Sequence, residues 1–163
     1  MRDQRLVSQT LMALCVSGLT SLVAGHATAS CALIKKDDDR ALCRAKERGR
    51  SAQCGLIKDH DKRAYCRAIT GSGRGSCGLI KRADLRSACR AETGGGAGQC
   101  GLIQDNDQRA LCRAQQAKRS GACGLIRDPD LRAYCRAMTG SGRGSCGLIK
   151  DDDLRSRCRA EVR

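Results

Sequence analysis

From residue 31 onward, the apolar positions of the chain recur in one short pattern. A cysteine, a small residue, Leu and Ile form a first apolar group, and a second apolar group leads into Cys-Arg-Ala. An acidic stretch separates the two groups, as in the segment CGLIRDPDLRAYCRA at residues 123–137. Two short apolar groups around an acidic turn predict a helical hairpin.

Local signals place the start and the end of the longer helix of each hairpin. Asp128 is suited to cap a helix whose first residue is Pro129. Thr-Gly pairs at 70–71, 93–94 and 139–140 predict its end, because glycine adopts the left-handed conformation there. The expected fold is all-α, an α-solenoid-like array of short disulfide-stapled helical hairpins with little or no β-structure. The position of Asp128 is occupied in the other repeats by Asp59, Asp105, Asp151, Lys36 and Arg82.

The cysteines give this array its period. Twelve cysteines after residue 30 alternate in separations of 12 and 11, so the pattern recurs every 23 positions. Tyr65 and Tyr134 occupy the same position three repeats apart, which suggests that a block of three repeats was duplicated. We therefore expect one region, residues 30–163, that holds six repeats. Their ranges are 31–53, 54–76, 77–99, 100–122, 123–145 and 146–163.

The first 29 residues have the features of a secretory signal peptide. Arg2 and Arg5 precede a mostly apolar stretch at residues 11–23, and Ala27 and Ala29 form a small-x-small cleavage pattern. We expect cleavage after Ala29, a periplasmic or extracellular location, and no transmembrane anchor in the mature protein.

Composition shows why this chain needs its sulfurs. After Ala29 the chain keeps 12 of the 13 cysteines and holds 11 Leu, 7 Ile, 1 Val and no Phe or Trp. These large aliphatic residues are about 14% of the mature chain. Charged chains with less than roughly 20% of such residues tend to stay disordered. Disulfides must therefore supply stability that the apolar core cannot.

Helix geometry favours pairing within each repeat. In one continuous helix Cys123 and Cys135 would lie about 18 Å apart, whereas a hairpin folded at Asp128 brings them level. Pairing across the gaps of 11 is also sterically possible, but it leaves Cys31 and Cys158 without partners. The favoured pairs are Cys31–Cys43, Cys54–Cys66, Cys77–Cys89, Cys100–Cys112, Cys123–Cys135 and Cys146–Cys158.

The repeat unit C-x2-I-x-D-x-D-x-R-x2-C-R-A resembles cysteine-rich tandem repeats of exported or toxin-associated bacterial proteins of unknown role. The resemblance covers the whole mature chain, with departures at Ala32 and at Ala83-Asp84. It implies a helical disulfide-linked array and assigns no activity, cofactor or functional residue.

The sequence contains no recognisable catalytic constellation, and we expect no enzyme and no cofactor. His60 is the only histidine after residue 29, and other repeats replace it with Asp, Ala, Asn or Pro, as expected of a solvated turn residue. There is no C-x-x-C redox motif. A thiolate metal site would need reduced cysteines brought together by folding, so it remains a lesser alternative.

Two arginines per repeat form the most distinctive polar feature. One precedes the second cysteine by three residues and the other follows it directly, so the two share a helix face. They could bind a polyanion or an acidic protein. Alternatively, part of this ladder pairs with the Asp-x-Arg aspartates Asp38, Asp61, Asp84, Asp107, Asp130 and Asp153. The ladder comprises Arg40, Arg44, Arg63, Arg67, Arg86, Arg90, Arg109, Arg113, Arg132, Arg136, Arg155 and Arg159.

These observations favour a non-enzymatic exported structural or interaction module with a basic surface. Its partner would be an acidic protein or a polyanionic envelope component. Sequence-specific nucleic-acid binding is not expected, because two tyrosines cannot form a stacking platform along a strand. The alternatives are a cationic secreted effector or antimicrobial factor that acts on anionic envelopes, and a thiolate metal-binding protein.

The cysteine spacing predicts six disulfides and no free thiol in the mature protein. Intact mass and thiol alkylation under denaturing conditions should detect no reactive cysteine. Six or more reactive thiols in freshly isolated protein, or a Cys43–Cys54 peptide in a disulfide map, would contradict this prediction.

Overall fold

The computed structural model describes residues 31–162, and the predicted signal peptide, residues 1–29, lies outside the described residues. The described chain is helical, and none of its helices is long and apolar enough to cross a membrane. The long helices are α2 (Asp37–Arg48), α3 (His60–Arg67), α4 (Ala83–Arg90), α6 (Asn106–Ala117), α7 (Pro129–Arg136) and α8 (Asp152–Glu161). The short segments before them are η1 (Ser51–Leu56), η3 (Gly73–Leu79), α5 (Ala97–Cys100), η5 (Ser120–Leu125) and η7 (Arg143–Leu148). Three π-helical turns, η2 (Ala68–Ser72), η4 (Ala91–Gly95) and η6 (Ala137–Ser141), extend α3, α4 and α7.

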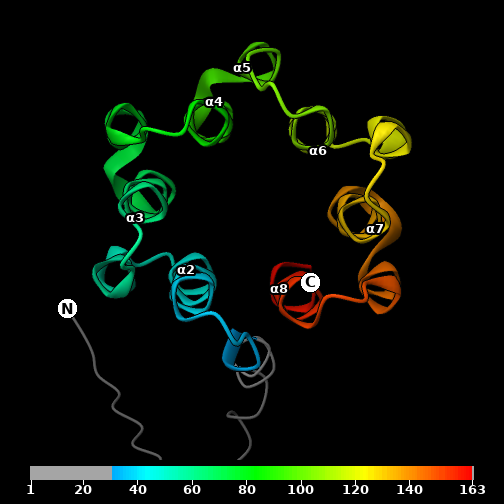
Figure 1. The fold of residues 1–163 in the computed structure, drawn as a ribbon, viewed down its shortest axis with the longest axis horizontal. Coiled ribbons are helices and arrows are strands. Elements are labelled where there is room, and N and C mark those ends of the chain that lie inside the picture. The colour runs from blue at the N-terminus through cyan, green and yellow to red at the C-terminus, as the bar shows by residue number, and fades with distance from the viewer. Residues whose placement is uncertain (1–30, 163) are drawn as a thin grey trace, which may run out of the picture.

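The repeats are arranged as a ring. Figure 1 shows the long helices around a central space and the short segments outside them. Each long helix is followed by a segment that runs back on the outside, so the long helices all point in one direction. The first and last of them, α2 and α8, are in contact and close the ring.

The predicted helix starts are confirmed. Asp128 caps α7, where its side chain accepts from the Leu131 amide at 2.7 Å. Asp59, Asp105 and Asp151 make the same contact, which is worth about 1 kcal/mol for each helix. Lys36 and Arg82 occupy the position in α2 and α4 without a side-chain cap.

The disulfides of the structure are those favoured from the sequence. Each joins the short segment of a repeat to its own long helix, with Cα atoms 5.6–5.7 Å apart. Six such links are typical of proteins in an oxidising compartment. Each is worth roughly 2–4 kcal/mol, chiefly because it restricts the unfolded chain.

The core of each repeat is small and uniform. The isoleucine of Cys-x-Leu-Ile is about 1% exposed in every repeat, as at Ile80. The alanine that follows the second cysteine and its arginine, such as Ala91, is at most 5% exposed. These side chains and the cystines fill the space between neighbouring repeats, so the helices approach one another closely.

One aspartate per repeat connects it to the next. The carboxylate of Asp107 accepts from the backbone N–H groups of Arg127 and Asp128, both at 2.9 Å. Equivalent contacts link each repeat to its successor, at 2.8–3.0 Å. The aspartates are Asp38, Asp61, Asp84, Asp107 and Asp130.

The sixth aspartate makes the same contact back to the first repeat. Asp153 accepts from the amides of Lys35 at 2.7 Å and Lys36 at 3.4 Å. Ala160 of α8 packs in one apolar cluster with Cys31, Ile34 and Cys43 of repeat one. The junction between repeats six and one therefore repeats the internal junctions, although no peptide bond links them. The sequence predicted an array and did not indicate that it closes.

The common direction of the long helices gives the ring two different faces. We call the side that holds their N-termini the aspartate face, because every aspartate after residue 30 lies in a first turn or its cap. The connector face is formed by the residues between the second cysteine of one repeat and the first cysteine of the next.

We expect removal of Asp153 to loosen the seam between repeats six and one. The change Asp153→Ala leaves the Lys35 and Lys36 amides without an acceptor, at a cost of about 1–3 kcal/mol. Amide hydrogen exchange should then become faster throughout the first and last repeats, because no peptide bond holds them together.

Asp107→Ala is the matched control, since it removes the same contact at an internal junction. There the faster exchange should stay confined to Arg127, Asp128 and their neighbours. Equally confined exchange in both variants would contradict the role of Asp153 in closing the ring.

Acid should unfold the ring. Two backbone N–H donors hold the pKa of each of five aspartates below its usual value of 3.8. A lowered pKa contributes stability above the pKa of the unfolded chain, and this stability is lost as the pH falls through the folded pKa. Thermal melts followed by circular dichroism should show a constant Tm near neutrality and a steady fall below about pH 4. A Tm that stays unchanged to about pH 2 would contradict this.

Candidate functional site

The first arginine stabilises the repeat itself in five of the six repeats, and in repeat two Arg63 is half-buried. Arg86 is half-buried, and its Nη1 donates to the carbonyl of the core residue Ile80 at 2.8 Å. The Asp-x-Arg aspartates, which the sequence offered as partners, instead bind backbone amides of the next repeat. The same isoleucine contact is made by Arg40, Arg109, Arg132 and Arg155.

The second arginine of each repeat has a different environment. It follows the second cysteine and begins the stretch that forms the connector face. Arg67, Arg113, Arg136 and Arg159 are exposed, whereas Arg44 and Arg90 are half-buried. We call the five arginines that bind the isoleucine carbonyl the inner arginines, and the four exposed ones the outer arginines.

The other candidate groups have plain structural surroundings. His60 is exposed at the first residue of α3, with Nδ1 3.4 Å from Asp61. Three potential ligand atoms lie within 4.8 Å of one another: the sulfurs of Cys31 and Cys43 and a carboxylate oxygen of Glu47. Both sulfurs belong to a disulfide, so this group offers no thiolate.

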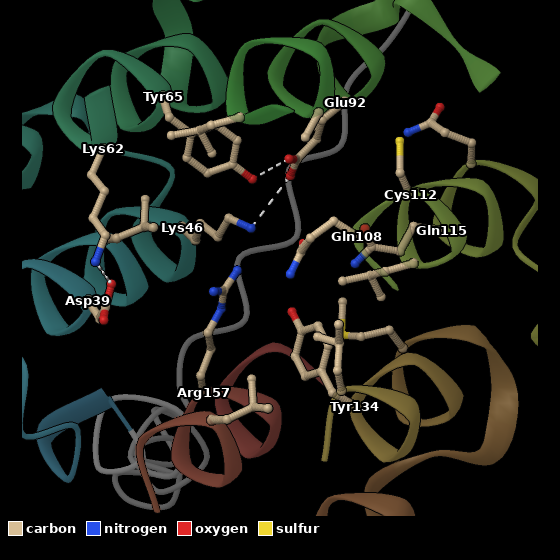
Figure 2. Close-up of a pocket in the computed structure, with 18 of the residues that line it drawn as sticks. Asp39, Lys46, Lys62, Tyr65, Glu92, Gln108, Cys112, Gln115, Tyr134 and Arg157 are labelled. Atoms are coloured by element: carbon tan, nitrogen blue, oxygen red, sulfur yellow. Dashed lines mark hydrogen bonds and ion pairs between the residues drawn. The ribbon is translucent and has the colours of Figure 1, made fainter. Parts of the chain in front are cut away.

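A cavity of about 700 Å³ occupies the centre of the ring and is lined by all six repeats (Figure 2). In every repeat, the residues four and one positions before the second cysteine face it, and in four repeats the residue three positions after that cysteine does so too. This spacing of three and four residues places them on one side of a helix. The first position holds Asp39, Lys62, Leu85, Gln108, Leu131 and Leu154, and the second holds Leu42, Tyr65, Ala88, Leu111, Tyr134 and Arg157. At the third position Lys46, Glu92, Gln115 and Met138 line the cavity.

The cavity is where the repeats differ from one another. The two cysteines, the core isoleucine, both ladder arginines and the alanine that follows are the same in all six repeats. The cavity positions hold acids, bases, amides, aromatic and aliphatic residues. The lining is therefore asymmetric inside a nearly symmetric scaffold.

A network of charges and hydroxyl groups crosses one side of the cavity. Lys46 Nζ lies 3.5 Å from Glu92 and 3.6 Å from Glu161, and Arg157 Nε donates to Glu161 at 3.1 Å. The hydroxyls of Tyr65 and Tyr134 donate to Glu92 and Glu161, respectively. Lys46 and Arg157 also lie over the rings of Tyr65 and Tyr134, at 5.7 and 5.6 Å from their centroids. Figure 2 shows Lys46, Tyr65, Glu92, Tyr134 and Arg157 converging from α2, α3, η4, α7 and α8.

The network keeps Glu161 and Lys46 charged. Burial opposes ionisation of Glu161, but Arg157 and Lys46 outweigh it and lower the pKa of Glu161 to about 2. Burial likewise opposes the charge of Lys46, and Glu161 and Glu92 raise its pKa above the usual value. Burial, with the carboxylates nearby, raises the pKa of both tyrosines, so their hydroxyls remain donors at neutral pH.

Sequence reasoning missed this cavity, although its signals were present. The matching positions of the two tyrosines were interpreted only as a trace of duplication, and their partners Glu92 and Glu161 also lie three repeats apart. The informative signal was variation at three helix positions in a repeat that is otherwise constant. These variable positions can be recognised as one cavity lining only when the helices are known to surround a common axis.

Comparisons with protein families, with curated proteins and with solved structures give no match for this chain.

Proposed function

We propose that this protein is a non-enzymatic exported module, periplasmic or extracellular, whose connector face binds an acidic protein or a polyanion. The observation that supports the proposal is the uneven distribution of charge between the two faces. Because the ring is stapled by disulfides and closed on itself, such a face would be presented as a rigid surface.

The charges divide unevenly along each repeat. The connector stretches in residues 31–162 carry 13 Lys and Arg against three Glu. The stretches from the first to the second cysteine carry 15 Lys and Arg against 13 Asp. Nearly all of the excess positive charge therefore belongs to the connector stretches.

The outer arginines suit this role better than the inner ones. The outer arginines lie in repeats two, four, five and six, so their charges are spread around the ring. Binding of a polyanion to such a face releases its counterions, and the affinity depends steeply on salt. An acidic protein would be attracted by the same field.

Neutralising four outer arginines should weaken binding to a polyanion without unfolding the ring. For the combined variant Arg67→Gln, Arg113→Gln, Arg136→Gln and Arg159→Gln, we expect earlier elution from heparin. In a plot of the logarithm of affinity against the logarithm of salt concentration, the line should become less steep. Its slope should decrease by roughly 0.7–0.9 for each arginine that no longer binds the polyanion. Titration of heparin at several salt concentrations measures this slope.

The control removes four cations from the aspartate face, Lys58, Lys81, Arg127 and Lys150, also by change to Gln. The net charge falls by four in both the control and the connector-face variant. If binding depended on net charge alone, both variants would lose the same affinity. Equal slopes in the two variants, or an unchanged slope in the connector-face variant, would overturn the proposal.

An anionic envelope is a second candidate partner, favoured by a different feature. Six leucines, one in each Cys-x-Leu-Ile segment, are 59–69% exposed around the outside of the ring. In five repeats the residue two positions later is Lys or Arg, as in Leu125 and Arg127. Apolar side chains beside basic ones suit the surface of an anionic membrane. Sedimentation with anionic vesicles that depends on these leucines would favour this candidate over a soluble polyanion.

A further inference from the structure

The central cavity has the size and the lining of a small-molecule site. Its volume of about 700 Å³ lies within the range of roughly 300–1,000 Å³ that is usual for ligand pockets. Solvent reaches it, since the side chains of Lys46, Glu92 and Arg157 are 21, 42 and 31% exposed. The exposed arginines Arg67, Arg113, Arg136 and Arg159 of the connector face are not part of its lining.

The asymmetry of the lining argues for an asymmetric occupant. A scaffold that only had to fill its centre could use one residue type in all six repeats, as it does at the isoleucine and alanine positions. Instead the charged network lies on α2, η4 and α8, while the apolar residues Leu111, Leu131, Met138 and Leu154 line the cavity from α6, α7, its extension η6 and the first turn of α8. Such a cavity matches a molecule with one polar and one apolar end.

Hydrogen-bond accounting indicates the polar end. Both oxygens of Glu92 and both oxygens of Glu161 already have donors. Arg157 uses Nε for Glu161, whereas its two terminal nitrogens have no acceptor within the described part of the chain. Figure 2 shows its guanidinium group directed into the cavity, with the side chain of Gln108 extending toward the same space. At Arg157 the unused capacity is therefore that of a donor, which suits a carboxylate.

We propose that the central cavity binds a small organic acid. Its carboxylate would lie at the terminal nitrogens of Arg157 and the Gln108 amide, with its apolar body against Leu131, Leu154 and Met138. Arginine suits this role because its planar guanidinium group can bind both oxygens of a carboxylate.

The protein contains its own reporter for this site. Its two tyrosines both line the cavity, and it has no tryptophan. Intrinsic tyrosine fluorescence therefore reports on the cavity alone. A ligand that approaches Tyr134 should change the emission, while binding at the connector face should leave it unaltered.

The experiment titrates the oxidised protein with sodium n-octanoate, followed by tyrosine fluorescence and calorimetry. We expect saturable one-to-one binding, with n-octylamine binding at least tenfold more weakly because it offers no acceptor. Arg157→Ala should weaken octanoate binding about tenfold or more. Alanine already occupies the equivalent position of repeat three, at Ala88. Arg157→Lys, which keeps the charge without the planar group, should recover part of the loss.

Arg159→Ala is the matched control, because it removes an exposed arginine two residues away. Together with the four-arginine connector variant, it should bind octanoate like the parent, so this site and the connector face can fail independently. If Arg157→Ala does not fold, Leu154→Gln tests the apolar end of the site. Glutamine already occupies the equivalent position of repeat four, at Gln108. No saturable fluorescence change, equal binding of octylamine, or parent-like octanoate binding by the folded cavity variants would overturn the proposal.

Discussion

The ring depends on the contact between an aspartate carboxylate of one repeat and two backbone amides of the next. Asp107 with Arg127 and Asp128 is typical, and the same geometry recurs at every junction. The amides lie at and just before a helix start, where backbone donors would otherwise lack partners within the helix. One side chain thus satisfies two donors and fixes the distance and angle between repeats. Because Asp153 makes this contact with repeat one, neither end of the array is left open.

This arrangement explains how so few large apolar residues can support a folded chain. Within a repeat, the cystine and one isoleucine form the core, and an alanine such as Ala91 lets the next repeat approach closely. The first ladder arginine adds a hydrogen bond to the isoleucine carbonyl. These few positions and the aspartate contact recur in every repeat, whereas the positions that face the ring axis combine buried side chains such as Tyr134 with partly exposed ones such as Lys46. The residue type at these positions changes from repeat to repeat, so the cavity is where the repeats differ.

Two properties of the ring bear on its function, and they have separate physical origins. The charge difference between the faces arises because aspartates collect at the positive ends of the long helices, while the connectors carry arginine and lysine. The cavity arises because six hairpins surround one axis and their inner side chains do not fill the space around it. A surface partner at the connector face and a small molecule in the cavity could therefore be bound independently by one disulfide-stapled ring.

Local sequence determined much of this structure. The repeat period, the hairpin in each repeat, the disulfide pairs and the helix caps, such as Asp128, depend on short-range contacts within one repeat, and the sequence predicted them. Ring closure depends on the sum of the angles between repeats, which no local pattern encodes. The partners of Asp107 lie 20 and 21 residues further along the chain, and those of Asp153 lie 118 and 117 residues earlier. The cavity network joins Lys46, Glu92 and Arg157 from distant repeats, so only the closed tertiary structure decided that these side chains would meet.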